Sequence, residues 1–245
     1  MSGSYEALGL VYDELTKNVG YEKRAAFVDS TLRQNNISGI VLDAGCGTGT
    51  LTLLLEKCGY EMIGADFSEN MLAVAAQKKH GAIVFLNQEL SKLDLYGTVN
   101  AVVCMQDTLN HIVSLDRLQC VFDRFALFTE RGGMLIFDVN TSYKSEHVLG
   151  SNSFVFETEK SFCVWQNEYS KRKKAVKVTF DVFVCDCGKG YRRMTDEFWE
   201  YDYSDKVLRQ CLEKAGYSLL EVLDGETYMP IQNDSQRALY IAKRL

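Results

Sequence analysis

Proline is almost absent from the chain, because Pro230 is the single proline among 245 residues. No apolar run approaches the length of a membrane span, and residues 1–10 lack the basic and apolar regions of a signal peptide. The formal net charge is −6, so the chain also lacks the excess of cationic residues that a broad nucleic-acid footprint requires. We therefore expect a cytoplasmic protein that contacts neither a membrane nor a long stretch of nucleic acid.

Sequence signals for a bound metal are also missing. Of the eight cysteines, Cys185 and Cys187 form the one close pair, and neither a second pair nor a histidine lies at the spacing of a zinc site. The other cysteines lie in apolar or helical contexts, where cysteine behaves as a small hydrophobic residue. We expect free thiols and no metal.

What the chain does contain is an apolar strand that runs into three alternating glycines. Residues 40–44 are Ile-Val-Leu-Asp-Ala, and Gly45, Gly47 and Gly49 follow them. Glycines let the backbone turn sharply and approach a ligand where a Cβ would collide. The next segment, 50–58, places leucines on one face of a helix, so unpaired helix N–H groups point at whatever the loop binds. This pattern predicts a nucleotide-type site.

Two acids refine this prediction. Asp43 stands two positions before the first glycine, at the end of the strand, where a carboxylate can accept a hydrogen bond from an ammonium group. Asp66 ends the next apolar run, 61–65, at the spacing where a carboxylate takes both hydroxyls of a ribose. A helix N-terminal acid beside the capping Ser68 is a second interpretation of Asp66. A dinucleotide site fits poorly, because Thr50 stands where that motif needs Gly or Ala.

Taken in order, four segments resemble the class I S-adenosylmethionine-dependent methyltransferases. Residues 41–50 and 64–71 are similar to the first two motifs of that family, and residues 85–90 to its third strand and adenine-contacting acid. Residues 131–138 are similar to a turn and strand that usually begins Pro-Gly-Gly, with Arg131 in place of the proline. Several ordered motifs are far more specific than one glycine loop. The resemblance implies S-adenosyl-L-methionine as the methyl donor.

The resemblance also implies which residues bind this donor. They come from the N-terminal segment and from the ends of the first four strands with the loops that follow, and they are Tyr12, Asp43, Gly45, Cys46, Gly47, Gly49, Asp66, Phe67, Met71, Gln88, Glu89, Leu90, Met105, Gln106, Asp107 and Asn110. For Glu89, a solvated turn is the alternative interpretation.

The segment 104–111 follows the fourth strand and is similar to the family position where donor and acceptor meet. It lacks the Asn/Asp-Pro-Pro-Tyr motif of enzymes that methylate nucleic-acid amino groups, and the chain has no Pro-Cys nucleophile for cytosine. His111 is the one histidine near the expected methyl group, and histidine accepts a proton near neutral pH. We predict that His111 is a general base; a histidine bonded to backbone at a helix start is the alternative.

Alternating strands and helices predict an α/β fold with a doubly wound, mostly parallel seven-stranded sheet of the Rossmann-like methyltransferase type. Between residues 141 and 201 the pattern changes to alternation, as in Val176 and Val178, which predicts an antiparallel three-stranded insertion. We expect a donor-binding core from residues 1–140 and 202–245, and a substrate cover from residues 141–201.

Three functions stay open at this point. A methyltransferase acting on a nitrogen or oxygen of a small molecule is favoured, because the donor site is complete and the cover is aromatic and compact. An RNA methyltransferase rests on the cationic run Lys171–Lys174 at a hairpin tip, although such a run is usually a solvated turn. The third is a regulator that binds S-adenosylmethionine without catalysis. An exposed edge of the insertion could also pair two chains about a two-fold axis.

Overall fold

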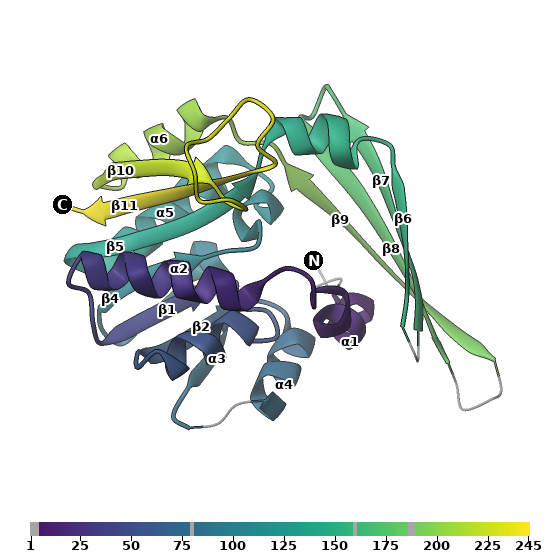
Figure 1. The fold of residues 1–245 in the computed structure, drawn as a ribbon, viewed down its shortest axis with the longest axis horizontal. Helices are drawn as coiled ribbons and strands as arrows, with labels where there is room; N and C mark the ends of the chain where they lie inside the picture. Colours follow the sequence, from purple (N-terminus) through teal and green to yellow (C-terminus); the bar gives the residue numbers. More distant parts are fainter. Residues whose placement is uncertain (1–4, 79–80, 159–160, 186–189) are drawn as a thin grey trace.

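The computed structural model describes residues 5–78, 81–158, 161–185 and 190–245, so Cys187 lies outside the described residues. It contains a seven-stranded sheet, a separate four-stranded antiparallel sheet, and helices on both faces of the first sheet (Figure 1). Among the described residues, no helix is long and apolar enough to cross a membrane.

The helices and strands follow one another in the order that the sequence predicts for an α/β fold. The helices are α1 (Glu6–Leu15), α2 (Tyr21–Gln34), α3 (Thr50–Lys57), α4 (Glu69–Lys78), α5 (Leu115–Phe128) and α6 (Asp205–Lys214), with short helical turns η1 (Leu90–Lys92), η2 (Thr108–His111) and η3 (Lys144–Leu149). The strands of the large sheet are β1 (Ile40–Ala44), β2 (Glu61–Asp66), β3 (Val84–Asn87), β4 (Val99–Cys104), β5 (Thr129–Asn140), β10 (Tyr217–Asp224) and β11 (Arg237–Arg244). Those of the second sheet are β6 (Ser153–Glu157), β7 (Ser161–Ser170), β8 (Ala175–Cys185) and β9 (Tyr191–Tyr201).

The large sheet has the strand order β10-β11-β5-β4-β1-β2-β3. Strands β1 to β5 pair in parallel, whereas β11 is antiparallel to both β5 and β10. The predicted seven-stranded, mostly parallel sheet is therefore confirmed. Strand order reverses beside β1, which has β2 on one side and β4 on the other, and ligands of such sheets bind at this switch point, outside the carboxyl ends of the strands.

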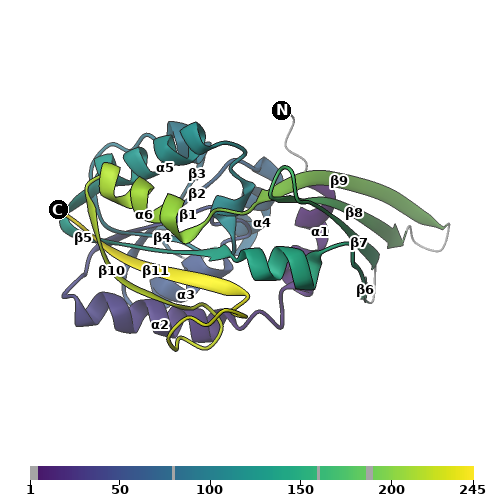
Figure 2. The same cartoon turned by 90° about the horizontal axis from the view of Figure 1, so that it is seen from above.

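Both faces of the large sheet are covered by helices, as Figure 2 shows. Successive residues of a strand point to opposite faces, so Leu42 and Val102 pack toward α5 and α6, while Val41 and Val103 pack toward α2 and α3. All four side chains are fully buried. Burial on both faces explains why the central strands are continuous apolar runs in the sequence.

The second sheet is a meander in the order β6-β7-β8-β9, inserted between β5 and α6. It has four strands, so the expectation of a three-stranded insertion was wrong by one. The additional strand, β6, lies at the edge and pairs only with β7 among the described strands. Its residues 154–156 are apolar at consecutive positions, so the sequence shows no alternation of apolar and polar residues, although Phe154 packs against the apolar cluster of the second sheet and Val155 is exposed. Pairing of two chains through this edge stays a prediction.

Helix α1 was not predicted as an element, yet it connects the two sheets. It packs against α4 and against β8 and β9, with Leu8 and Val11 in one apolar cluster with the second sheet (Figure 1). The carboxylate of Asp196 on β9 accepts a hydrogen bond from the Leu8 N–H at 2.9 Å. Near the other end of α1, Asp13 accepts one from Thr48 Oγ1 at 2.6 Å. Helix α1 is thus fixed to both the insertion and the glycine loop.

Candidate active site

The glycine loop after β1 lies at the carboxyl end of the large sheet. Gly45, Gly47 and Gly49 have positive φ angles of 78°, 52° and 75°. A Cβ at Gly45 would lie 2.3 Å from Cγ2 of Thr108, so only glycine fits there. This close approach brings the loop after β4 against the loop after β1, where the two can share a ligand.

Asp66 ends β2 and is held by two backbone groups. Its Oδ2 accepts a hydrogen bond from the Gly47 N–H and its Oδ1 from the Ser68 N–H, both at 2.9 Å. Burial raises the pKa of the Asp66 carboxyl, although these two hydrogen bonds oppose the rise. Both interpretations of Asp66 made from the sequence are compatible with this geometry, because each oxygen retains a further lone pair.

The loop after β4 adopts a strained backbone. Gln106 and Asp107 are consecutive non-glycine residues with positive φ, at 59° and 53°. Residues in such conformations concentrate at functional sites. The Asp107 N–H donates to Asp138 Oδ1 at 2.7 Å, which stabilises the turn. The side-chain Nε2 of Gln106 is buried without a hydrogen-bond partner in the described part of the chain, so this donor is available to a ligand.

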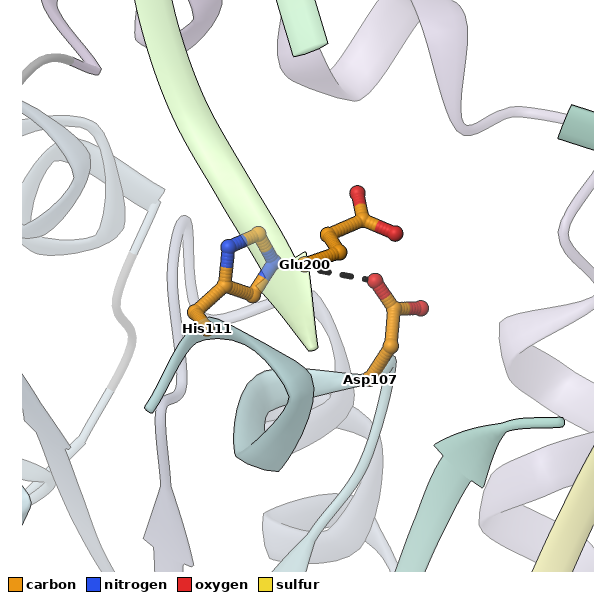
Figure 3. Close-up of side chains that lie close together, drawn as sticks. All are labelled: Asp107, His111 and Glu200. Atoms are coloured by element: carbon orange, nitrogen blue, oxygen red, sulfur yellow. Dashed lines mark ion pairs between the residues drawn. The ribbon is translucent and has the colours of Figure 1, made fainter. Parts of the chain in front are cut away.

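Figure 3 shows a cluster of three ionisable side chains from two elements that are far apart in the sequence. Asp107 and His111 come from the loop and turn after β4, and Glu200 comes from β9. One ligand atom from each lies within 4.8 Å of the others, and His111 Nε2 is 3.7 Å from Asp107 Oδ2. The other ring nitrogen of His111, Nδ1, lies 2.8 Å from the Tyr5 hydroxyl.

The charges around His111 set its proton affinity. Burial lowers the pKa of His111, but the nearby carboxylates of Asp107 and Glu200 raise it by more, so the net shift is upward. For the Glu200 carboxyl, burial raises the pKa, and the negative charge of Asp107 raises it as well. A histidine beside two carboxylates is therefore a stronger base than a free imidazole.

Arg237, at the start of β11, anchors this cluster. It donates from Nη2 to Asp107 Oδ1 at 2.6 Å and from Nη1 to Asp138 Oδ1 at 2.7 Å, and its side chain is almost completely buried. Burial of Asp107 works against its ionisation, yet Arg237 holds the pKa of Asp107 well below its usual range. Asp107 is therefore a fixed anion beside His111.

Asn140, at the end of β5, connects Glu200 to a lysine. Its Nδ2 donates to Glu200 Oε2 at 3.1 Å, and its Oδ1 accepts from Lys144 Nζ at 2.8 Å. Burial lowers the pKa of Lys144, and the nearby Arg237 lowers it further. The amide of Asn140 thus bridges the Glu200 carboxylate and the Lys144 ammonium group.

A cavity of about 620 Å³ lies between the carboxyl ends of the strands, helix α1 and the second sheet. Sites for small molecules usually have volumes of ~300–1,000 Å³. Its lining includes these residues predicted from the sequence: Tyr12, Gly45, Gly47, Asp66, Phe67, Met71, Glu89, Leu90, Gln106, Asp107 and His111. The structure thus brings most of the predicted site together.

The remaining predicted residues do not line this cavity in the described structure; they are Asp43, Cys46, Gly49, Gln88, Met105 and Asn110. Asp43 is 2% exposed, accepts a hydrogen bond from Thr52 Oγ1 at 2.6 Å, and burial raises its pKa to about 7. Asn110 instead donates to the Tyr201 carbonyl at 2.8 Å and so connects the turn η2 to β9. The roles of these residues in donor binding stay predictions.

Glu89 follows β3 at the other end of the cavity. Its Oε1 accepts a hydrogen bond from Ser91 Oγ at 2.6 Å and also pairs with Arg117. Glu89 is therefore a positioned carboxylate and not simply a solvated turn residue. Contact with a donor base stays a prediction.

Sequence reasoning missed several residues of this cavity, including Tyr5, Lys144, Glu200 and Arg237. One signal was present for Glu200, because Asp196 and Glu200 recur in phase with the apolar Phe198 on the inner face of β9. Acids in phase with buried residues indicate a polar site under a sheet. Arg237 gave no such signal, since it precedes an ordinary apolar strand.

Comparisons with known proteins agree with this geometry. Residues 41–133 match a family model described as a methyltransferase domain. A protein of Geobacillus sp. (strain WCH70) that is named as a methyltransferase is 28% identical over 246 residues, which cover 98% of this chain and 100% of that protein.

Two solved structures are also similar. A S-adenosylmethionine-dependent methyltransferase from Clostridium acetobutylicum ATCC 824 has a TM-score of 0.87 and 27% identity, and the match covers 99% of each chain. CalS10 of Micromonospora echinaspora, an amino pentose methyltransferase with bound S-adenosylmethionine, has a TM-score of 0.76 over 96% of this chain and 97% of that chain. Its 18% identity shows a shared fold alone.

Three findings now point the same way. The strand order places a glycine loop and the Asp66 carboxylate at the switch point of the sheet, a cavity extends from them to His111, and the similarity to methyltransferases covers the whole chain. S-adenosylmethionine is the methyl donor. The chain is a class I S-adenosylmethionine-dependent methyltransferase.

Proposed function

We propose that this methyltransferase transfers the methyl group to a nitrogen or oxygen of a small molecule, and that residues 141–201 cover the acceptor. The observation that carries the proposal is the cavity itself, which lies under α1 and the inner face of the second sheet and has the volume of a small-molecule site. The fold shared with CalS10, which is named for a small acceptor, supports the same class.

The residues present fit the donor. S-adenosylmethionine supplies a methyl group that is already activated by its sulfonium. Asp66 would accept the ribose hydroxyls, and Gln106 Nε2, which has no partner in the described residues, would donate to a polar group of the donor. The glycine loop leaves room for close approach to the backbone.

In our proposal, the chain contributes position and proton removal. Transfer is an in-line displacement, which depends on holding the acceptor near attack distance, an effect worth up to ~7–11 kcal/mol. His111 takes the proton of the acceptor at Nε2, and the fixed anion Asp107 stabilises the imidazolium that results. The insertion and α1 hold the acceptor and exclude water.

The RNA alternative is supported by little in the structure. In the cationic run Lys171–Lys174, the Lys173 ammonium lies 3.9 Å from the centroid of the Trp199 ring, so one cation is engaged within the insertion. Helix α1 lies over the cavity, and a duplex or long strand would need that face to be open. A small acceptor fits this arrangement better.

Replacing Asp66 with asparagine should weaken the binding of S-adenosylmethionine by about 1.5–3 kcal/mol, the range for a hydrogen bond to a charged group. Asparagine is preferred to alanine, because its one carbonyl oxygen can still accept from Gly47 or Ser68, whereas alanine would leave both N–H groups unpaired. Calorimetric titration measures the change, with Glu69→Gln on α4 as a control. Equal affinities of D66N and the wild type would remove Asp66 from donor binding.

Incubation with methyl-labelled S-adenosylmethionine and a cell extract should place the label in the metabolite fraction, when metabolites, RNA and protein are separated. The cavity has the volume for a small acceptor, and the chain carries a net charge of −6. Label in the RNA fraction, together with RNA binding that weakens steeply as the salt concentration rises, would show that the acceptor is RNA and overturn the small-molecule proposal. Donor binding without label from two independent extracts would indicate a regulator.

A further inference from the structure

Glu200 is a buried carboxylate whose hydrogen-bonding capacity is not filled by the protein. It lies on the inner face of β9, is 5% exposed and lines the cavity. Within the described part of the chain, it accepts one hydrogen bond, from Asn140 to Oε2. A buried carboxylate is costly unless a cation or further donors compensate it. Glu200 therefore points to a ligand that brings positive charge or N–H donors.

Two more acceptor atoms lie beside it. Arg237 occupies Oδ1 of Asp107, which leaves Oδ2 toward the cluster. When His111 is neutral and its Nδ1–H donates to the Tyr5 oxygen, Nε2 is an acceptor as well. Three acceptors, from Asp107, His111 and Glu200, then lie within 4.8 Å of one another (Figure 3). This arrangement suits a group that has several N–H donors and a positive charge.

Aromatic rings lie beside this cluster on the side of His111. The Phe198 ring centroid lies 5.2 Å from that of His111 and 5.3 Å from that of Tyr5. The Phe67 ring lies 5.4 Å from the Tyr5 ring. Aromatic faces attract organic ammonium groups, including methylated ones, by cation–π interaction. Carboxylates next to such rings fit an amine before and after methylation.

We propose that the acceptor is a small-molecule amine, held as an ammonium by Glu200, Asp107 and the rings of Tyr5 and Phe198. The proposal rests on the proposed small-molecule function and narrows its acceptor to nitrogen. One ammonium proton passes to His111 Nε2. The lone pair that is freed forms the N–C bond to the methyl group as the C–S bond breaks, and the electron pair of that bond stays on sulfur in S-adenosylhomocysteine.

A divalent metal ion is the competing occupant of these three residues. Two ligands of a tetrahedral Zn²⁺ lie about 3.3–3.6 Å apart, given metal–ligand distances of about 2.0–2.2 Å. The 3.7 Å between His111 Nε2 and Asp107 Oδ2 is close to this spacing, so charge has to decide, and Arg237 already compensates the charge of Asp107. Lys144 adds a second cation through Asn140. A monovalent organic cation with aromatic neighbours therefore fits better than a divalent ion.

The first test uses benzylamine and benzyl alcohol as probes on protein saturated with S-adenosylhomocysteine. We expect calorimetry to show at least tenfold tighter binding of benzylamine, and Glu200→Gln should abolish this preference while the affinity for S-adenosylhomocysteine stays unchanged. Glu168→Gln, which changes an exposed acid on β7 of the same sheet, is the matched control and should bind as the wild type does. Equal binding of the two probes, or an unchanged preference in E200Q, would overturn the proposal.

The second test identifies the atom that is methylated. Labelled metabolites should be retained by a cation exchanger at neutral pH and should keep their label in alkali, which cleaves methyl esters. Mass spectrometry should then place the methyl group on nitrogen. Label on oxygen would refute the amine proposal and leave the small-molecule function intact. Absence of label from the metabolites would refute the small-molecule function. The titrations with benzylamine and benzyl alcohol would still show whether the site prefers an amine.

A third measurement addresses the metal. Treatment with EDTA should leave methyl transfer unchanged. Loss of transfer that Mg²⁺ or Mn²⁺ restores, together with calorimetric binding of that ion in the wild type but not in E200Q, would assign the cluster to a metal and overturn the amine proposal.

Discussion

Replacing His111 with alanine is expected to lower kcat for methyl transfer by about 10²- to 10⁴-fold, the usual contribution of a general base. The affinity for S-adenosylmethionine should not change, because Asp66 and the glycine loop stay in place. His147→Ala is the matched control, since His147 is exposed on η3 and does not line the described cavity. A labelled-methyl assay under single-turnover conditions measures the effect. A kcat within threefold of the wild type would leave proton removal to another group.

The pH profile gives the same prediction a second readout. His111 must be neutral to accept a proton, and the net effect of its surroundings is to raise its pKa above the ordinary value of 6.5. Activity should therefore be complete above that raised pKa and lost as pH falls through it. Glu200→Gln removes a negative charge that raises the pKa of His111, so the acidic limb should move to lower pH. If the acidic limb of E200Q stays at the wild-type pH, the limb does not report the titration of His111.

Replacing Arg237 with methionine should lower the free energy of unfolding by about 3–5 kcal/mol, because one partner is removed from a buried ion pair. Arg237 pairs with Asp138, whose side chain is fully buried, and with Asp107. Denaturant unfolding measures the loss. Arg209→Met is the control, since Arg209 and Asp205 form an exposed pair on α6, and such pairs are worth ~0.3–0.5 kcal/mol.

A second variant separates charge from packing. If the uncompensated carboxylate is the cause, R237M combined with Asp138→Asn should recover part of the stability that R237M alone loses. No recovery, or a loss in R237M as small as that in R209M, would contradict the argument.

The pair with Asp107 also predicts acid sensitivity in the wild type. Burial opposes ionisation of Asp107, but Arg237 depresses its pKa, so this stabilisation is present above the unfolded pKa of ~3.9 and lost as pH falls below it.

The sequence by itself determined the large sheet and the end of the cavity at the glycine loop and Asp66, where we propose that the donor binds. These features depend on interactions between residues that are near in sequence: apolar runs that alternate with helices, and a glycine loop that needs positive φ at Gly45 and Gly49. Asp66 could be placed because it ends the very next strand, and parallel strands put their carboxyl ends at one edge of the sheet. Each of these patterns lies within a short segment of the sequence.

Only the tertiary structure decided the end of the cavity around His111, where we propose that the acceptor binds. Glu200 and Arg237 reach His111 and Asp107 from strands that are about ninety or more positions away in the chain, and α1 joins the cavity through Asp13 and Asp196. The edge strand β6 escaped prediction for a different reason, because its residues 154–156 are apolar at consecutive positions and so show no alternation. Contacts between distant segments depend on how the two sheets pack, and a periodic pattern in one segment does not say which residues of the other segment it will meet.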